Sequence, residues 1–206
     1  LFGGYNRYLW APSLWNKIKW MPFQARKILG SSISSIPISA WDKLGDAYNY
    51  FNNGSQRIAQ LGDKAHKTSR RLQTVHSIDE LYKNLVCEWP NPNQLVLDSS
   101  SKEHAKEIHL LNEPLPEVGM ETPESRMMYW DTISYMTDDI LCKVDRAAMG
   151  ISLETRVPFL DHRVAELAWE MPMWMKIRDG QGKWPLREIL YKRVPKTMIE
   201  RPKAGF

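Results

Sequence analysis

Apolar residues recur at helical spacing in several stretches of the chain, and this pattern predicts a mainly helical protein. The clearest stretch begins at Ser77, which has the capping-box spacing to Glu80 that is typical of a helix start. The apolar side chains that follow fall on one helical face: Ile78, Leu81, Tyr82, Leu85 and Val86. We therefore expect a helix that starts at Ser77 and buries this face.

The last part of the chain predicts further helices. One covers residues 124–135, and another begins after Thr137, whose side chain is suited to an N-cap. Asp161 can cap a helix that ends before Pro172. Pro185 suits the first position of a last helix, where the missing N–H costs no helical hydrogen bond.

Breaker residues organise the first quarter of the chain. Residues 1–20 indicate a Gly-Gly turn that leads into a helix. The serine-rich stretch 30–37 and the Asn-Asn-Gly at 52–54 indicate breaks, which leaves a short helix near residues 39–51.

Between Pro90 and Pro123 the prolines predict a loop-rich connection, with one short helical possibility at residues 101–111. No stretch alternates convincingly as a strand, and no internal repeat is present. The expected fold class is thus mainly α.

The composition is that of a globular protein, with 43% hydrophobic and 25% charged residues among 206. This length allows one domain or two small lobes, and we begin from a single compact unit. Cys87 and Cys142 are too few for a disulfide framework and indicate buried thiols in a reducing compartment. Because no apolar run is long enough to span a bilayer and no signal peptide opens the chain, we expect a cytoplasmic protein and no membrane partner.

The net charge of +4 and the isoelectric point near 9.0 do not indicate nucleic-acid binding, because basic and acidic residues alternate over most of the chain. A local excess of basic residues occurs only near the end of the chain, and such an excess suits an anionic small ligand such as a polyphosphate. Its members are Lys183, Arg187, Lys192, Arg193, Lys196, Arg201 and Lys203.

Acidic and basic residues are densest between Asp138 and Arg146. At helical spacings of three and four, Asp139 can meet Lys143 and Lys143 can meet Arg146, with Asp145 beside them. Such a cluster can border a charged ligand. The pattern alone favours the other reading, a solvated helix surface that carries routine ion pairs.

A second candidate is the apolar loop that contains Glu154 and Arg156. If partly buried, these two charges need each other or a ligand, since an unpaired buried charge is costly. The alternatives are therefore an ion pair that shapes the loop and a binding site.

Two lysines near the end lie in backbone settings that can hold an anion. Lys183 follows Gly182 and precedes a helix, and Lys203 lies in a segment constrained by proline and glycine. A capped turn and a basic tail explain the same residues without a ligand. The five histidines show no zinc pair and no nucleophile motif, so we expect no metal ligated by the chain.

Five blocks carry a resemblance to a known family. In sequence order they are residues 1–8 (LFGGYNRY), 138–149 (DDILCKVDRAAM), 152–163 (SLETRVPFLDHR), 182–183 (GK) and 201–206 (RPKAGF). This chain resembles the carboxy-terminal part of the synthetase domain of glutamine-hydrolysing asparagine synthetases. The resemblance extends over nearly the whole chain and implies the helical part of an α/β domain of the ATP-pyrophosphatase type.

That family uses ATP and Mg²⁺ to adenylate the side-chain carboxylate of aspartate, and ammonia released from glutamine then displaces AMP. An amino-terminal glutaminase domain supplies the ammonia, so the resemblance implies aspartate, ATP, ammonia and that domain as partners. A homodimer is a further possibility. Related synthetases that form β-lactams or amidate other carboxylates share these blocks, and a helical interaction module without chemistry remains an alternative.

The resemblance also implies residue roles. Lys203 matches a lysine that stabilises charge at the acyl centre, and Lys183 matches one near the triphosphate. Lys143, Asp145 and Arg146 match a helix that borders the pocket.

Glu154 and Arg156 match the loop that shapes the same pocket. The family's S-G-G-x-D-S and S-G-D-G-G-D-E segments are absent from the sequence, which begins with Leu1. We therefore expect this chain to be a piece of a longer protein. By itself it should neither bind MgATP tightly nor make asparagine, and exposed apolar surface should favour self-association.

Overall fold

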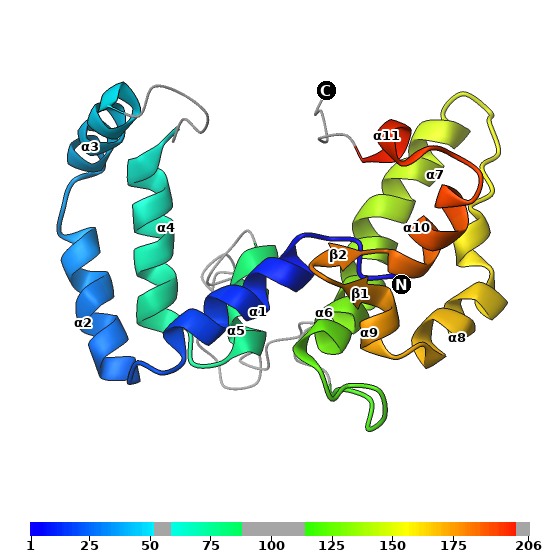
Figure 1. The fold of residues 1–206 in the computed structure, drawn as a ribbon, viewed down its shortest axis with the longest axis horizontal. Coiled ribbons are helices and arrows are strands. Elements are labelled where there is room, and N and C mark those ends of the chain that lie inside the picture. The colour runs from blue at the N-terminus through cyan, green and yellow to red at the C-terminus, as the bar shows by residue number, and fades with distance from the viewer. Residues whose placement is uncertain (52–58, 88–113, 201–206) are drawn as a thin grey trace, which may run out of the picture. The chain divides into compact units, whose positions relative to one another are not determined.

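The computed structural model describes residues 1–51, 59–87 and 114–200, and Figure 1 shows that its regular elements are almost all helices. The predicted helical fold class is confirmed. The turn predicted at residues 52–54 and the short helix predicted at 101–111 lie outside the described residues.

The chain divides into two compact units. Unit 1 consists of Leu1–Pro12 and Asn93–Phe206, and unit 2 consists of Ser13–Pro92. The boundary falls inside the first helix, α1 (Arg7–Ile18), directly after its internal proline. The helix predicted within the first twenty residues is therefore present.

Unit 2 is organised around helix α4 (Leu61–Thr74), against which α2 (Phe23–Ser34) and α3 (Ile38–Phe51) both pack (Figure 1). Glycines make the close approach possible. A Cβ on Gly30 would lie 2.8 Å from the backbone oxygen of a residue on α4, and one on Gly62 would lie 2.5 Å from the backbone oxygen of Ile38. The helix predicted at 39–51 corresponds to α3.

The break predicted across residues 30–37 is wrong for most of its length, because α2 continues to Ser34. The serine hydroxyls do not interrupt the helix, since they donate to carbonyls one turn earlier. Ser32 donates to Ile28 and Ser35 donates to Ser31, at 3.0 and 2.8 Å. Three residues, Ser35 to Pro37, separate α2 from α3.

Helix α4 has no counterpart among the predicted helices. Its buried positions are Gly62, Ser69 and Leu72, so two of the three carry no large apolar side chain. Helical periodicity of apolar residues is the signal that sequence reading depends on, and small residues at a tight helix contact remove that signal.

Helix α5 (Ile78–Val86) confirms the capping prediction. The Ser77 hydroxyl accepts a hydrogen bond from the Glu80 amide at 3.1 Å, and the Glu80 carboxylate accepts one from the His76 amide at 2.6 Å. Leu81 and Tyr82 on the predicted face are fully buried.

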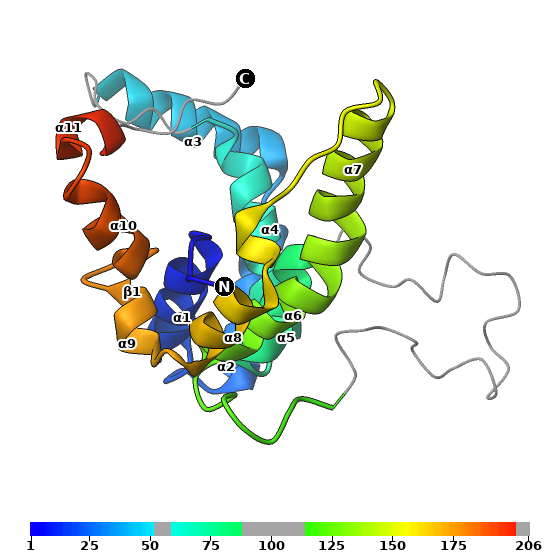
Figure 2. The ribbon, with the colours of Figure 1, turned by 90° about the vertical axis from the view of Figure 1, so that its right-hand side faces the viewer.

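Unit 1 contains one continuous helical rod, visible in Figure 2, that runs through α6 (Pro123–Asp131), a π-helix (Thr132–Leu141) and α7 (Cys142–Met149). The prediction that Thr137 starts a second helix is therefore wrong. Its hydroxyl donates to the carbonyl of Ile133 at 3.0 Å, in the preceding turn, so it lies inside the rod.

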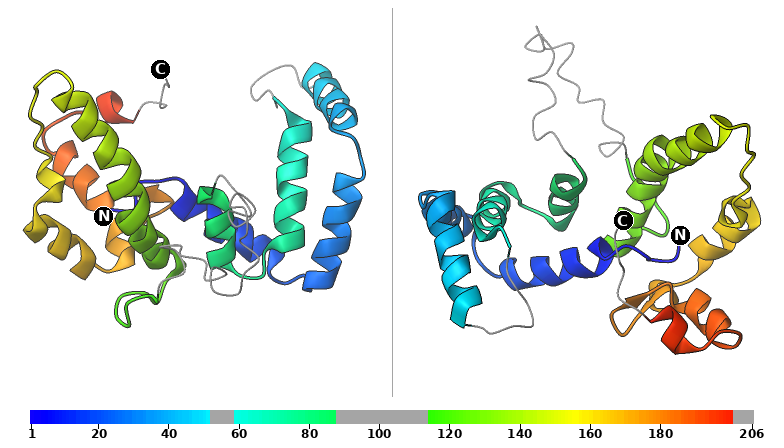
Figure 3. Two further views of the ribbon diagram at one scale, coloured as in Figure 1. Left: turned by 180° about the vertical axis from the view of Figure 1, so that it is seen from behind. Right: turned by 90° about the horizontal axis from the view of Figure 1, so that it is seen from above.

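After α7 an extended segment leads to α8, as Figure 3 shows from behind. Asp161 caps α8 as predicted, because its carboxylate accepts the amide of Arg163 at 2.9 Å. Pro185 occupies the second rather than the first position of the last long helix. The elements of this part are η4 (Pro158–Leu160), α8 (His162–Glu170), α9 (Met173–Lys176), β1 (Ile177–Arg178), β2 (Gln181–Gly182), α10 (Trp184–Tyr191) and α11 (Lys196–Ile199).

Strands β1 and β2 form an antiparallel hairpin that was not predicted. Its loop is Asp179-Gly180, with φ of +50° and +73°, the left-handed pair that a two-residue hairpin turn requires. The Asp-Gly signal was available in the sequence. The strands were missed because two residues each are too few to show alternation.

The remaining global expectations have simple outcomes. Cys87 and Cys142 are not in a disulfide, and both are half-buried rather than buried. Across the described residues, no helix is both long and apolar enough to cross a membrane.

Candidate functional site

The amino-terminal residues of unit 1 lie directly against the hairpin. The Phe2 carbonyl accepts the Lys183 amide at 2.8 Å. A Cβ on Gly182 would fall 1.9 Å from the carbonyl oxygen of Gly3, and one on Gly4 would fall 2.3 Å from Cε of Lys183. These glycines therefore allow the amino-terminal segment, the hairpin backbone and the Lys183 side chain to pack more closely than residues with a Cβ could.

Lys183 joins the hairpin to α10. It is the N-cap residue of that helix, with a left-handed backbone (φ +60°), so the chain turns sharply there. Its side chain is exposed, and no carboxylate of the described residues pairs with its ammonium. A free ammonium beside a helix start and glycine backbone is a suitable contact for a phosphate group.

Lys176, on α9, is a buried cation that sequence reading did not select. Its residue is 2% exposed, and its Nζ lies 5.2 Å from the ring centroid of Trp169. Burial lowers the pKa of this lysine. Only the burial distinguishes it from other lysines, and no local sequence pattern announces that burial.

A network on α10 fixes the carbonyl that precedes Lys183. Arg187 Nε donates to the Gly182 carbonyl at 3.0 Å, and its Nη1 donates to a Glu200 carboxylate oxygen at 2.6 Å. The Tyr191 hydroxyl donates to the same oxygen, and these bonds lower the pKa of Glu200, with that of the tyrosine the largest cause.

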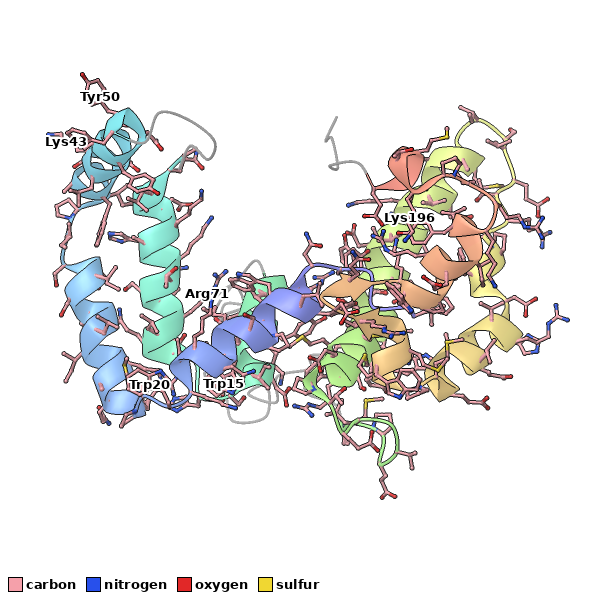
Figure 4. All side chains as sticks on the ribbon, in the orientation of Figure 1. Trp15, Trp20, Lys43, Tyr50, Arg71 and Lys196 are labelled. Atoms are coloured by element: carbon pink, nitrogen blue, oxygen red, sulfur yellow. The ribbon has the colours of Figure 1, made fainter. Side chains whose placement is uncertain are left out.

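Lys196, labelled in Figure 4, begins α11 and lies over the Tyr191 ring, 4.8 Å from its centroid. The network therefore ties α11 to the Lys183 turn.

Asp131, a buried acid at the end of α6, has both a hydrogen-bond donor and a cation beside it. Tyr8 donates a short hydrogen bond to it, and Arg7 Nε lies 3.2 Å from the same carboxylate oxygen. The Arg7 guanidinium is also 4.5 Å from the ring centroid of Tyr5 and 4.9 Å from that of Tyr135. This cluster ties the start of α1 to the helical rod of unit 1.

The predicted cluster on α7 is a solvated surface. Lys143 pairs with Asp139 as predicted, with 2.5 Å between Nζ and Oδ1, and this hydrogen bond raises the pKa of the lysine. Lys143, Asp145 and Arg146 are all exposed.

The expectation that Glu154 and Arg156 are partly buried is wrong. They pair with each other, as the ion-pair alternative required, yet their side chains are 70% and 87% exposed. Every residue from 151 to 160 is exposed. The loop carries apolar side chains without a core to bury them, so neither charge is forced to find a ligand.

Lys203 lies outside the described residues, so its role at the acyl centre remains a prediction. Among the described residues, no group of three or more histidine, cysteine or carboxylate side chains is placed to hold a metal. The cations near the Lys183 turn fit a phosphate chain, and Mg²⁺ would then be held mainly through phosphate oxygens, as is common for that ion.

Comparison with known proteins identifies similar sequences. The family model described as asparagine synthase matches residues 1–206. Asparagine synthetase [glutamine-hydrolyzing] 3 of Bacillus subtilis (strain 168) is 32% identical over 134 residues, which cover 64% of this chain and 21% of the relative. A putative asparagine synthetase [glutamine-hydrolyzing] of Mycobacterium tuberculosis (strain ATCC 25618 / H37Rv) is 42% identical over 84 residues, or 41% of this chain and 13% of the relative.

The human asparagine synthetase [glutamine-hydrolyzing] is 39% identical over 71 residues, which cover 33% of this chain and 12% of that protein. The chain thus spans about a fifth or less of the length of these relatives. No solved structure matches it.

Proposed function

Because the chain belongs to the asparagine synthase family, we propose that it supplies the helical part of a synthetase domain that converts aspartate to asparagine with ATP. The observation that carries the proposal is the match over all 206 residues, joined to a free lysine at a glycine-lined turn. The relatives are named as glutamine-hydrolysing, and we propose glutamine as the source of ammonia here too.

The proposed reaction has two steps. An oxygen of the aspartate side-chain carboxylate attacks the α-phosphorus of ATP, a P–O bond forms, and pyrophosphate leaves with the electrons of the broken bond. Ammonia then attacks the activated carbonyl carbon, AMP leaves, and the nitrogen loses a proton. The products are asparagine, AMP and pyrophosphate.

Lys183 would hold the phosphates in this reaction. Its ammonium is unpaired among the described side chains, and the hydrogen bond from Arg187 to the Gly182 carbonyl restrains the turn that carries it. We propose that Lys203 stabilises charge at the acyl centre, because a nearby ammonium lowers the energy of a developing anion. Lys143, Asp145 and Arg146 would border the pocket only if a ligand reaches the exposed face of α7.

We also propose that unit 1 is the helical part of an α/β domain of the ATP-pyrophosphatase type. Support comes from the apolar side chains that its helices and loops expose. Leu167 is 54% exposed on α8, Ile189 is 63% exposed on α10, and Ile151 is 76% exposed in the loop after α7. Helices that cover a sheet carry such surfaces on the covered side. A cytoplasmic setting is part of the same proposal.

The test is asparagine and AMP formation by the full-length protein from aspartate, MgATP and ammonia, for wild type and Lys203→Ala. We expect both products from wild type and a loss of at least a hundredfold in the variant, the order of one strong electrostatic contact. Lys27→Ala, an exposed lysine of unit 2, is the matched control and should keep full activity. ATP consumption with a carboxylate other than aspartate would instead favour a related amidotransferase and would show that aspartate is not the substrate.

A further inference from the structure

Lys176 is buried without a counter-charge. Its residue is 2% exposed, and the only interaction of its ammonium with the described residues at short range is with the ring face of Trp169, at 5.2 Å. No carboxylate or carbonyl of the described residues accepts a hydrogen bond from it. A buried ammonium in this state destabilises the fold, and such groups persist in proteins mainly where a ligand uses them.

Lys176 and Lys183 lie at the open end of the same hairpin, because Lys176 directly precedes β1 and Lys183 directly follows β2 in an antiparallel pair. Asp131, a buried carboxylate of this unit, already accepts a hydrogen bond from Tyr8 and pairs with Arg7. Among the described residues, neither lysine forms an ion pair with a carboxylate.

Backbone without side chains lies beside both lysines. Lys176 precedes β1 and Lys183 follows β2, and Gly3 and Gly4 run beside both. These two residues place no charged side chain beside the lysines, and a Cβ on Gly4 would fall 2.3 Å from Cε of Lys183. A polyphosphate carries enough negative charge to match two ammonium groups, whereas the single charge of one carboxylate does not.

We infer that Lys176 binds a phosphate oxygen of the nucleotide, as the buried partner of the exposed Lys183. The inference rests on the proposed function for the identity of the nucleotide. It adds a second lysine, whose low exposure strengthens its attraction for an anion because water screens it less. Burial of the Lys176 charge without a ligand lowers the stability of the fold, and a bound anion raises that stability again.

The test measures thermal unfolding of the full-length protein with and without inorganic pyrophosphate. Lys176→Met keeps the length and removes the charge, so it should melt a few degrees above wild type without ligand. Pyrophosphate should raise the melting temperature of wild type and of the control Lys27→Met, and should no longer raise that of Lys176→Met. Lys176→Arg, which keeps the charge, should recover part of the response.

The inference is overturned if pyrophosphate stabilises Lys176→Met as much as wild type, if it stabilises neither, or if Lys176→Met fails to fold. A response to aspartate alone would assign the ammonium to a carboxylate and also overturn it. The readout requires no turnover. If the protein makes no asparagine but shows the lysine-dependent response, the proposed reaction is wrong and the Lys176 site stands. If it makes asparagine without that response, the proposed reaction stands and the Lys176 site is wrong.

Discussion

Among the described residues, each unit buries one cation, and the two cations have different partners. In unit 2, Arg26 is 5% exposed, and its Nη1 donates to the Val75 carbonyl at 2.8 Å. Its guanidinium also stacks on Trp15, labelled in Figure 4, with 5.3 Å to the ring centroid. In unit 1, Lys176 is equally buried and has only a ring face beside it.

The comparison separates a charge with a hydrogen-bond acceptor in the chain from one for which we propose a ligand. The chain gives Arg26 a carbonyl acceptor and an aromatic face, although its buried Nε has no acceptor, so this residue joins α2 to the end of α4. Nothing described in the chain satisfies Lys176. Every predicted site residue that the structure describes also lies in unit 1, so the proposed chemistry belongs to that unit.

The largest effect on stability is expected from the removal of the Arg26 charge. Arg26→Met should lower the free energy of unfolding by about 3 kcal/mol, because the buried Val75 carbonyl loses its donor and the aromatic stack loses its charge. Urea denaturation measures the change, and Lys27→Met is the exposed control on the same helix. A loss below about 1 kcal/mol would mean that the two buried cations are not different in kind.

The glycines at the hairpin provide the next largest effect. Gly182→Ala places a Cβ 1.9 Å from the Gly3 carbonyl oxygen, while Gly180→Ala meets nothing within 4 Å and strains only its backbone. Gly182→Ala should therefore cost about 2 kcal/mol more than Gly180→Ala. Equal costs in chemical denaturation would show that the amino-terminal segment does not lie against the hairpin.

A smaller effect is expected on the pH dependence of stability through Glu200, the acid that pairs with Arg187. The pKa of Glu200 lies below its ordinary value of 4.5, mainly because the Tyr191 hydroxyl donates to it and secondly because of Arg187. A lowered carboxyl pKa stabilises the fold above the unfolded value, and this stability is lost as the pH falls through the folded value. Tyr191→Phe should therefore lower stability at neutral pH and flatten the acid-side decline.

Urea midpoints measured between about pH 6 and pH 3 would report this decline. Glu188→Gln, an exposed position on the same helix, serves as the control and should leave the curve unchanged. An identical slope for wild type and Tyr191→Phe would mean that the tyrosine does not hold the carboxylate in solution.

The smallest expected effect is on α7. Lys143→Ala removes a pair between two exposed side chains, so the unfolding midpoint should not change measurably. In the full-length protein the same variant tests the predicted role of the helix. A raised KM for ATP at unchanged stability would place a nucleotide on this face, and an unchanged KM would leave the ion pair as a surface feature.

Sequence reading was reliable where one short motif decides the local structure. Ser77 and Asp161 cap their helices as predicted, because a cap depends on hydrogen bonds within a few residues. It failed where a distant segment decides. Gly30 was taken for a breaker, and it is the contact that lets α2 approach α4.

The candidate site shows the same limit. Lys183 was predicted from adjacent glycine and proline, and the structure places it at a sharply turned N-cap. Lys176 could not be found this way, because its burial results from packing between α8, α9 and the hairpin rather than from its neighbours in sequence. For Glu154 and Arg156 the error is the opposite one. Their apolar neighbours suggested burial, and the structure shows both side chains exposed.

The central claim is that unit 1 serves a reaction that cleaves ATP between its α and β phosphates. Exchange of labelled pyrophosphate into ATP by the full-length protein tests it most directly. The account predicts exchange that requires aspartate and that falls at least tenfold in Lys183→Ala, the loss expected for one charge-assisted contact. Release of orthophosphate without exchange, or exchange that does not need aspartate, would contradict it.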